Sequence, residues 1–562
     1  MKNFAHALYI TVFALIAISC ETTELNLVED PNTIRPEEAN PQFLLNTMQL
    51  DYKRFIEDSQ DVNARLSRIN AMFMYNDQDG SYEDFFIFER NSTELEDNDL
   101  SAAWINFYLN IIPNFNLLQT NARATNSNIY NFNIAVANII KAHCASILVD
   151  QYADIPFSQA GQLLEFPNPE LEKGAMVYEK CIALLDEAID LLKEEPLNST
   201  IDDIFYDGDS QSWLRLANSL KLRMYKNTGN TNAFNAIIAS GDYISSTEHD
   251  MEFQYISGVR SPEITGDYPS TGGNLPIPKS NWLMGTMYDL NDPRLPYYFY
   301  RQTNETPGID INANPVLLPC SDDPIPSHYA GHYYCAAPAG YIGRSHGSNY
   351  DISGNDRPDR SIAALYGVYP HGGMFDDGRF MTASIANFPD VQGAVGFGKL
   401  LILTAFEVDF WRGQMANSVG EKAVFLRSAM EKQIAKVRTF GELDSTADLS
   451  TAPSASDFQD YVDNVITSYT NATSPEQENI FAEQYLIAHF GHGLESYNFY
   501  KKTGYPTSLS PSWNPNPGPF PRSFPYPDQE LYNSSTPLEN KALTDQVFWD
   551  TNPAFPTFPI AN

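Results

Sequence analysis

The chain is 562 residues long, and with 43% hydrophobic and 13% aromatic residues it can bury a sizeable core. Its 71 acidic residues outnumber 35 basic ones, and the formal net charge of −36 repels the phosphates of nucleic acids and other polyanions. We therefore expect no nucleic-acid partner and favour a neutral ligand.

The N-terminus has the pattern of an export signal. A lysine is followed by an apolar run from Ala7 to Ile18 and by small residues, which predicts a signal peptide over residues 1–19 rather than a membrane span. The residues before Cys20 are similar to a bacterial lipobox, so we expect Cys20 to be lipidated and residues 20–40 to form a flexible tether. The alternative is a plain signal peptide with an incidental cysteine. No later segment is expected to span a membrane.

Helical patterning begins at Pro41 and dominates the chain as far as residue 250. Residues 72–100 interrupt it as a long acidic, aromatic loop, and a helix with a kink at Pro113 follows over residues 104–119. Apolar residues at spacings of three and four then predict a helix over residues 132–151 with one buried stripe, a second over about 172–195 and a third over about 213–224. Helix pairs of this kind bury their stripes by stacking on neighbours.

The middle of the chain has a different composition. Residues 251–398 are dense in Gly, Pro, Tyr and His and predict a large loop-rich subdomain inserted between two helical halves. Helical patterning returns at Lys399 and continues through Trp411, then over residues 421–437 and 475–500. A Ser/Thr/Ala-rich linker is expected near residues 444–456, and residues 506–562 form a tail that must lie across the helices to be ordered.

Several sequence motifs, in this order, resemble those of SusD-like (SusD/RagB) outer-membrane lipoproteins. They are Asp150–Ala160, Tyr178–Ile189, Trp213–Arg223, Glu483–Tyr497 and Val547–Asp550. The resemblance implies a mainly α, SusD-like fold with tetratricopeptide-like helix pairs and a large loop-rich inserted subdomain. It also implies a single domain over residues 41–562, with a helical scaffold at 41–250 and 399–505, a glycan-binding region at 251–398 and a tail at 506–562.

The same resemblance implies a function at the outer membrane. A SusD-like protein is expected to be a surface-exposed lipoprotein that captures a neutral oligosaccharide or polysaccharide and delivers it to a TonB-dependent, SusC-like transporter. Such a protein needs no catalytic residue.

A glycan site needs flat rings that stack on the apolar face of a sugar, with polar groups beside them for its hydroxyls. Trp282 is the strongest candidate, because it lies among Pro, Ser and Asn in the predicted loop region rather than on a helical stripe. The other candidates are Tyr329, Tyr333, Tyr334, Asp322 and His332 in the loop before Cys335, and Tyr75 and Tyr82 in the early loop. The alternative for each ring is packing within its own loop. Trp513 is open to either role.

Cys320, His328, His332 and Cys335 lie close together in the sequence and are residue types that bind zinc. In an exported protein, two cysteines at this spacing more often form a disulfide, which we favour over free thiols or a metal site. Two acidic turns, Asp77–Gly80 and Asp351–Asp356, carry oxygen ligands that calcium tolerates but lack its full loop pattern, so solvated turns are favoured. We expect no metal or cofactor.

The evidence for catalysis is weak. Residues 343–347 match the pattern G-x-S-x-G, but no predicted strand precedes Ser345 and no predicted helix follows it, as a nucleophile elbow requires. Paired carboxylates carry no information in a chain with 71 acidic residues. We expect a binding protein rather than an enzyme; the alternatives are a surface glycoside hydrolase or esterase, or a structural subunit of a transporter without a ligand of its own.

Overall fold

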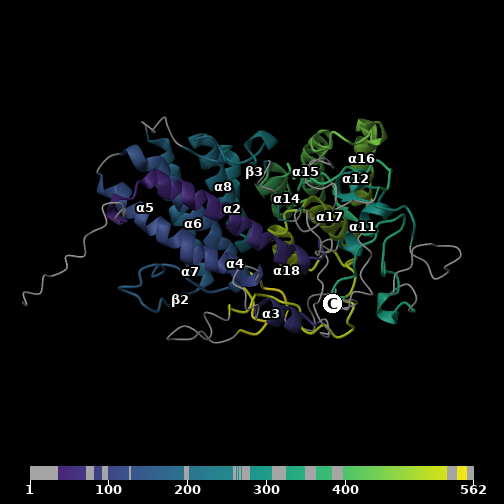
Figure 1. The fold of residues 1–562 in the computed structure, drawn as a ribbon, viewed down its shortest axis with the longest axis horizontal. Helices are drawn as coiled ribbons and strands as arrows, with labels where there is room; N and C mark the ends of the chain where they lie inside the picture. The colour runs from purple at the N-terminus through teal and green to yellow at the C-terminus, as the bar shows by residue number, and fades with distance from the viewer. Residues whose placement is uncertain are drawn as a thin grey trace, which may run out of the picture.

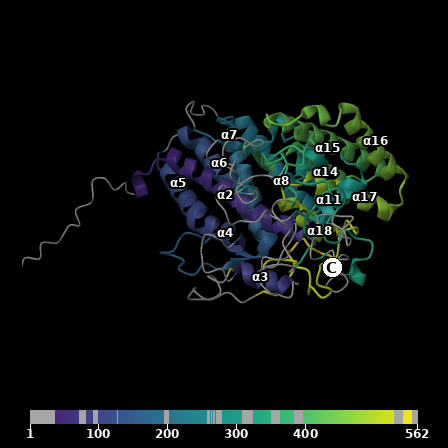
Figure 2. The same ribbon diagram turned by 45° about the vertical axis from the view of Figure 1, so that its right-hand side comes forward.

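The computed structural model describes residues 36–70, 81–90, 99–125, 128–194, 202–256, 261–262, 264, 268, 279–306, 320, 324–348, 362–381, 396–527 and 541–553. Over these residues the fold is mainly α-helical, as the sequence predicts, with only short two-stranded sheets. Figure 1 shows the purple-to-blue helices of the N-terminal half beside the green helices of the later half, with α18 between them, and Figure 2 shows the same arrangement after a turn.

The described N-terminal helices lie between residues 41 and 240. They are α2 (Pro41–Leu66), α3 (Tyr82–Arg90), α4 (Asp99–Asn106), α5 (Ile112–Ala124), α6 (Asn131–Tyr152), α7 (Gly174–Lys193), α8 (Ser210–Thr228) and α9 (Thr231–Ser240). The helices predicted around residues 132–151, 172–195 and 213–224 are confirmed as α6, α7 and α8. The kink expected near Pro113 takes the form of a π-helical turn, Phe107–Ile111, directly before α5.

Helix α6 differs from its prediction in one respect. The spacing of its apolar residues indicates one buried stripe, but every residue of α6 is buried. The cause is its place in the fold, because α2, α5, α7 and α8 all pack against it. Its polar residues are therefore buried as well, and they must find partners inside the protein.

The later helices are α14 (Ala405–Met415), α15 (Val419–Thr439), α16 (Ala455–Asn471), α17 (Ser474–Ala488) and α18 (Leu494–Thr503). The prediction of one helix over residues 475–500 is wrong, because the chain breaks between α17 and α18 at residues 489–493. Gly491 has a φ of +77° there, a conformation that glycine adopts readily. Helix α16 was not predicted; it begins at a capping box formed by Ser454 and Asp457.

A two-stranded antiparallel sheet joins the ends of the central region. Strand β3 (Met251–Gln254) pairs with β6 (Lys399–Leu403). The prediction of a helix from Lys399 is therefore wrong for the residues before α14, which begins after Thr404. Between β3 and β6 lie α11 (Asn281–Asp289), α12 (Leu295–Tyr298) and the pair β4 (Phe299–Tyr300) and β5 (Leu365–Tyr366). The remaining short elements are β1 (Ile155–Pro156), β2 (Leu171–Glu172) and the single turns Pro36–Glu38, Asn128–Tyr130, Thr247–His249, Ser327–Tyr329, Gly441–Leu443 and Leu449–Thr451.

The C-terminal segment packs across the helices, as the sequence predicts. The backbone N–H of Tyr82 in α3 donates to the Pro517 carbonyl at 2.8 Å, and the backbone N–H of Phe524 donates to the Gln151 carbonyl at the end of α6 at 2.6 Å. The yellow segment in Figure 1 accordingly runs past α3 and α18.

A buried ion network holds α6, α8 and α18 together with the tail. Arg223 of α8 donates to Asp150 of α6 at 2.5 Å and to Glu495 of α18 at 2.7 Å, and Lys226 donates to the other oxygen of Glu495 at 2.7 Å. The indole N–H of Trp549 in the tail donates to Asp150 at 2.8 Å. Each of these residues belongs to, or lies three residues after, one of the SusD-like sequence motifs. These motifs are far apart in the sequence, but their residues meet in one buried network.

One stretch, Asn128–Tyr152, is long and apolar enough to cross a membrane, with a mean hydropathy of 1.5. This corrects the expectation that no later segment has this property. Its apolar window is entirely buried among the other helices, which is the environment of a core helix.

Candidate functional site

The loop that ends at Cys335 is closed by a disulfide between Cys320 and Cys335, whose Cα atoms lie 5.7 Å apart. Sulfur atoms bonded to each other are not the thiolates that a zinc site needs. The Nε2 atom of His328 lies 3.2 Å from the carbonyl oxygen of Ser512 and 3.1 Å from that of Trp513. His328 thus fastens this loop to the C-terminal segment.

An aromatic pair forms where these two segments meet. The rings of Tyr334 and Trp513 stack with their centroids 4.7 Å apart and their planes 12° apart. Behind them Tyr329 is fully buried, and its hydroxyl donates to the Pro511 carbonyl at 2.9 Å. The backbone N–H of Trp513 donates to the His346 carbonyl at 2.7 Å. Tyr334 and Trp513 themselves are only half-buried, so part of each ring faces solvent.

The neighbouring residue, Tyr333, lies against helix α11. Its ring packs directly on Gly285, where any side chain would overlap it, and its hydroxyl donates to the Asp289 carboxylate at 2.6 Å. Partial burial, together with the Asp289 carboxylate, raises the pKa of Tyr333 to about 12, so its hydroxyl stays protonated as a donor. Tyr288, beside Asp289, is 39% exposed. We name Tyr288, Tyr333, Tyr334 and Trp513 the aromatic platform.

The platform has polar neighbours suited to hydroxyl groups. Asp289 offers carboxylate oxygens, and His332 lies beside Tyr329 with ring centroids 6.2 Å apart. Burial, with a smaller effect of Arg68, lowers the pKa of His332 below its usual value, so the ring is neutral near pH 7 and both donates and accepts hydrogen bonds. Rings beside neutral and acidic hydrogen-bonding groups form a surface that fits an uncharged sugar.

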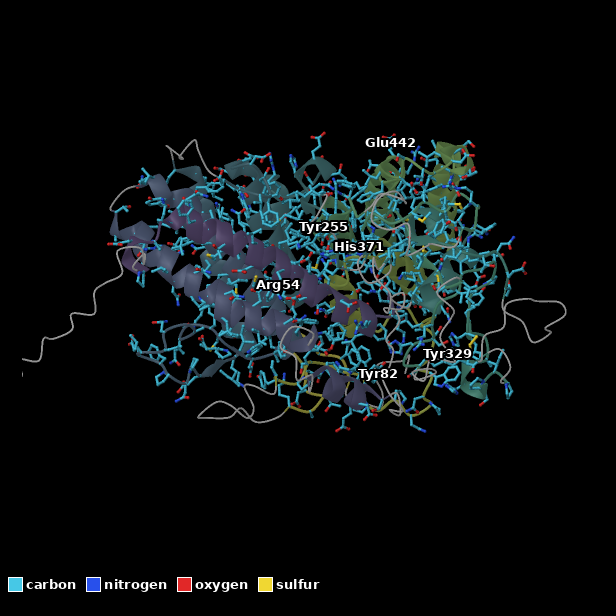
Figure 3. All side chains as sticks on the ribbon, viewed as in Figure 1. Arg54, Tyr82, Tyr255, Tyr329, His371 and Glu442 are labelled. Atoms are coloured by element: carbon cyan, nitrogen blue, oxygen red, sulfur yellow. A yellow bond between two sulfur atoms is a disulfide. The ribbon has the colours of Figure 1, made fainter. Side chains whose placement is uncertain are left out.

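Three of the predicted rings are not available to a ligand. Trp282 is the second residue of α11, not part of a loop, and is only 4% exposed. Tyr329 and Tyr82 are fully buried, and Tyr82 packs edge-to-face on Phe520 in the tail. Figure 3 labels Tyr82 and Tyr329 on the same side of the molecule. The prediction that these three present open rings is therefore wrong: each anchors its segment to the core.

The remaining candidates divide into two groups. Tyr333, Tyr334 and His332 are half-buried and lie together, whereas Tyr75, Asp322 and Cys20 lie outside the described residues. Tyr288 and Asp289 were missed, because their relevance depends on the long-range contact between Gly285 and Tyr333. A tyrosine beside an acidic residue in the last turn of α11 is the only signal that the sequence offers.

The G-x-S-x-G pattern has a packing explanation. Ser345 is buried, and the backbone of the preceding Arg344 pairs with residues 279–281 in one isolated bridge rather than joining a strand to a helix. A side chain at Gly343 would overlap the Lys279 carbonyl, so glycine is needed there for close approach. This geometry does not expose the serine hydroxyl as a nucleophile elbow does.

Comparisons with known proteins agree with this architecture. The profile of the SusD-like family described as "Starch-binding associating with outer membrane" matches residues 31–314. A solved structure titled a chitin-binding protein is 20% identical, with 91% of this chain and 100% of that chain covered at a TM-score of 0.62.

Two further solved structures are similar over the same extent. A SusD-like protein from Bacteroidetes is 17% identical, with 92% of this chain and 100% of that chain covered at a TM-score of 0.62. A chitin-binding SusD homologue from Flavobacterium johnsoniae is 16% identical, with 91% and 99% covered at a TM-score of 0.60. At these identities the structures establish the fold alone. No curated protein matches the chain.

Proposed function

This chain belongs to the SusD-like family, described as starch-binding and associated with the outer membrane, and from that premise we propose that it is a non-catalytic glycan-binding lipoprotein. It captures a neutral oligosaccharide or polysaccharide at the cell surface and delivers it to a TonB-dependent, SusC-like transporter. Cys20 carries the lipid anchor, and residues 20–40 are the tether between the membrane and the folded domain.

The observation that carries the proposal is the aromatic platform. Tyr334 and Trp513 are stacked on each other and held by the disulfide loop and the Tyr329 hydroxyl, so their rings are positioned before a ligand arrives. A preorganised ring surface loses little conformational entropy on binding. The half-exposed rings supply stacking area, and Asp289 and His332 supply hydrogen bonds to sugar hydroxyls.

The platform also supports the choice of a neutral ligand. Its polar groups are a carboxylate, tyrosine hydroxyls and an imidazole whose lowered pKa keeps it neutral. A sulfated or carboxylated glycan would bring negative charge toward Asp289 within a protein of net charge −36. Uncharged chains avoid this repulsion, and the matched family is described as starch-binding while one matched structure is titled a chitin-binding protein.

Binding is tested on the soluble form that begins after Cys20, by calorimetric titration with malto-oligosaccharides and chito-oligosaccharides. We expect Trp513→Ala and Tyr334→Ala each to weaken binding by about 2- to 12-fold, because one lost stacking partner costs about 0.5–1.5 kcal/mol. Trp513→Phe retains a ring and is expected to bind more tightly than Trp513→Ala. Phe43→Ala is the matched control, since Phe43 is an exposed ring on α2, away from the platform.

Two results would contradict the proposal. Unchanged affinity in both alanine variants, with unchanged melting temperatures, would show that sugar binds elsewhere. Release of shorter sugars during incubation with the purified protein, detected by chromatography, would replace capture by hydrolysis.

Delivery is tested in cells. We expect the lipidated protein to co-purify with a TonB-dependent transporter from outer-membrane extracts, and Cys20→Ala to lose its membrane attachment. Recovery of the wild-type protein without such a partner would contradict the delivery step while leaving glycan capture in place.

A further inference from the structure

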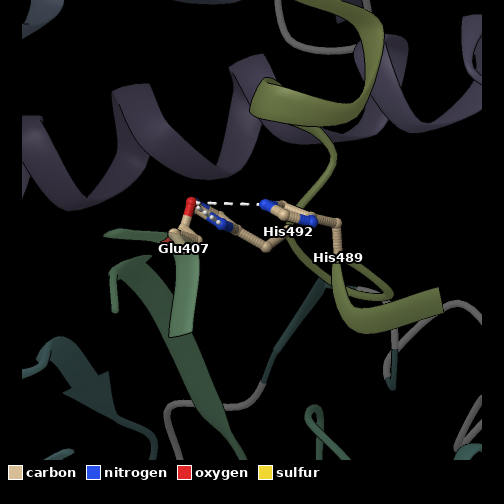
Figure 4. A group of neighbouring side chains, drawn as sticks. All are labelled: Glu407, His489 and His492. Carbon is tan, nitrogen blue, oxygen red and sulfur yellow. Dashed lines mark ion pairs between the residues drawn. The ribbon is translucent and has the colours of Figure 1, made fainter. Parts of the chain in front are cut away.

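Glu407, His489 and His492 form a buried cluster outside the aromatic platform. Glu407 lies in the first turn of α14, His489 directly follows α17, and His492 lies in the break before α18. All are at most 2% exposed, and one possible ligand atom from each lies within 4.8 Å of the other two. Figure 4 shows both imidazoles directed toward the Glu407 carboxylate.

The break in the helix brings the two histidines together. His489 and His492 are separated by Phe490 and Gly491, and the positive φ of Gly491 turns the chain sharply. Their rings lie nearly parallel, with centroids 6.0 Å apart and planes 12° apart. The backbone therefore presents both imidazoles to one carboxylate on another helix.

The hydrogen bonds fix the tautomer of His489. Its Nδ1 lies 2.6 Å from the carbonyl oxygen of Tyr485, and since a carbonyl only accepts, Nδ1 carries the proton. In the neutral ring Nε2 is then a lone-pair acceptor, and it faces Glu407 Oε1 at 3.6 Å. Two acceptors that face each other inside a protein repel unless a proton or a metal cation lies between them.

Glu407 is held with one oxygen directed at the histidines. Its Oε2 accepts from the backbone N–H and the hydroxyl of Thr404 at 2.8 and 2.9 Å, as the capping box of α14. Its Oε1 faces His492 Nδ1 at 3.0 Å and forms no hydrogen bond of good geometry, and neither does His492 Nε2 or His489 Nε2.

The neighbouring charges do not compensate this carboxylate. Arg223 and Lys226 already pair with Asp150 and Glu495 in the ion network, two positive charges against two negative ones. Among the described residues Glu407 forms no ion pair with a lysine or arginine, and the two imidazoles are the groups that face its Oε1. A buried charge of this kind requires a counter-charge.

We propose that Glu407 Oε1, His489 Nε2 and His492 Nδ1 bind one divalent transition-metal cation of the zinc class as a structural site joining α14 to the α17–α18 break. Two imidazoles and one carboxylate are a ligand set that zinc uses. Ligands about 2.0–2.1 Å from a tetrahedral zinc ion lie roughly 3.3 Å from one another, and the separations of 3.0 and 3.6 Å from Glu407 Oε1 lie on either side of that value.

The surroundings fit a structural site. Metal-bound histidines commonly donate their second N–H to a backbone carbonyl, as His489 does to Tyr485. Arg223, Trp411 and Glu495 close the small pocket beside His492, and every ligand is buried, so no substrate reaches the cation. The bound ion would link the helices that follow the inserted region to the ion network of the N-terminal helices.

The test uses the full protein purified in detergent, stripped with a chelator, reloaded with ZnSO4 and desalted. We expect about one zinc per chain by elemental analysis and a melting temperature that rises on reloading, because a cation that binds only the folded state stabilises it. Cobalt(II) in place of zinc is expected to give the visible absorption of a tetrahedral nitrogen–oxygen site.

Single variants then identify the ligands. His489→Gln, His492→Gln and Glu407→Gln are each expected to weaken zinc binding by about 10–100-fold or more, because loss of an outer partner alone costs that much. His249→Gln, a histidine on a different turn, is the matched control and is expected to retain the metal.

The wild-type comparison of stripped and reloaded protein needs no variant to fold. Absence of stoichiometric zinc, or zinc retained equally in all three ligand variants, would overturn the proposal. A wild-type protein that binds no zinc and shows a protonated His489 or His492 by NMR at pH 7 would assign the cluster to an imidazolium–carboxylate pair instead.

Discussion

The ion network and the aromatic platform differ in residue type and in burial. In the network, charged side chains from α6, α8 and α18 are almost completely buried and are stabilised by pairing with one another. In the platform, large rings are kept half-open to solvent by a disulfide, a glycine contact and a few hydrogen bonds. The scaffold therefore buries charges that are paired with one another, whereas the platform leaves its rings partly exposed.

Removal of one charge from the network is expected to have the largest effect. Glu495→Gln leaves Lys226 without its charged partner in the core and Arg223 with Asp150 alone, which costs about 3–5 kcal/mol of unfolding free energy. Denaturant unfolding measures the loss. The matched control is Glu187→Gln, because the exposed pair Arg123–Glu187 contributes at most about 1 kcal/mol. Equal losses in the two variants would contradict the difference between buried and exposed pairs.

The disulfide is expected to come next. A double change, Cys320→Ser with Cys335→Ser, removes a link that closes a loop with a sequence separation of 15, and a loop of this length contributes about 3 kcal/mol through the entropy of the unfolded chain. The unfolding free energy of the wild type in reductant is expected to match that of the double variant. Glycan affinity is expected to fall as well, since Tyr333 and Tyr334 are held by this loop. Unchanged glycan affinity would show that the loop takes no part in binding.

Gly285→Ala tests how Tyr333 is positioned. The added methyl group overlaps the tyrosine ring, and such overpacking costs about 1–3 kcal/mol. We expect a small loss of melting temperature together with weaker glycan binding, measured by the same titrations. Gly420→Ala in α15, where the methyl group meets open space, is the control and is expected to be neutral or stabilising. Full glycan affinity in Gly285→Ala would remove Tyr333 from the site.

Acidification is expected to lower the free energy of unfolding, by a smaller amount per pH unit than the substitutions above. Burial alone would raise the pKa of Glu495, but Lys226 and Arg223 outweigh it and hold the pKa well below its usual value. The stabilisation is therefore complete above the unfolded pKa of about 4.3 and is lost as pH falls toward the folded pKa. Between these values the wild type is expected to lose up to about 1.4 kcal/mol per pH unit more than Glu495→Gln does. Parallel pH profiles for the two proteins would contradict this assignment.

Local patterns were reliable where a helix is decided by its own residues. The three- and four-residue spacing of apolar side chains located α6, α7 and α8, and the SusD-like motifs around Asp150, Arg223 and Glu495 indicated the family. The prediction of a helix at Lys399–Leu403 was wrong, because an apolar run of this length is compatible with a buried strand as well as with a helix. Only the pairing with β3 decides between them.

The candidate site was predicted in part, and for a physical reason. The loop before Cys335 was singled out for its density of aromatic residues, and Tyr333 and Tyr334 are half-buried there, but exposure depends on what packs against each ring. Trp282 was ranked first because its neighbours are Pro, Ser and Asn, yet it begins a helix whose first turn is buried. Tyr334 and Trp513 lie far apart in the sequence and form one surface only after the tail crosses the loop region.

The sequence by itself determined the family, the mainly helical fold and the acidic character of the protein, since these depend on composition and short-range spacing. Tertiary structure alone decided which rings remain open, which charges pair inside the core and that Glu407 meets His489 and His492. Each of these depends on contacts between residues distant in the chain, and burial is a property of the whole packed molecule rather than of any segment.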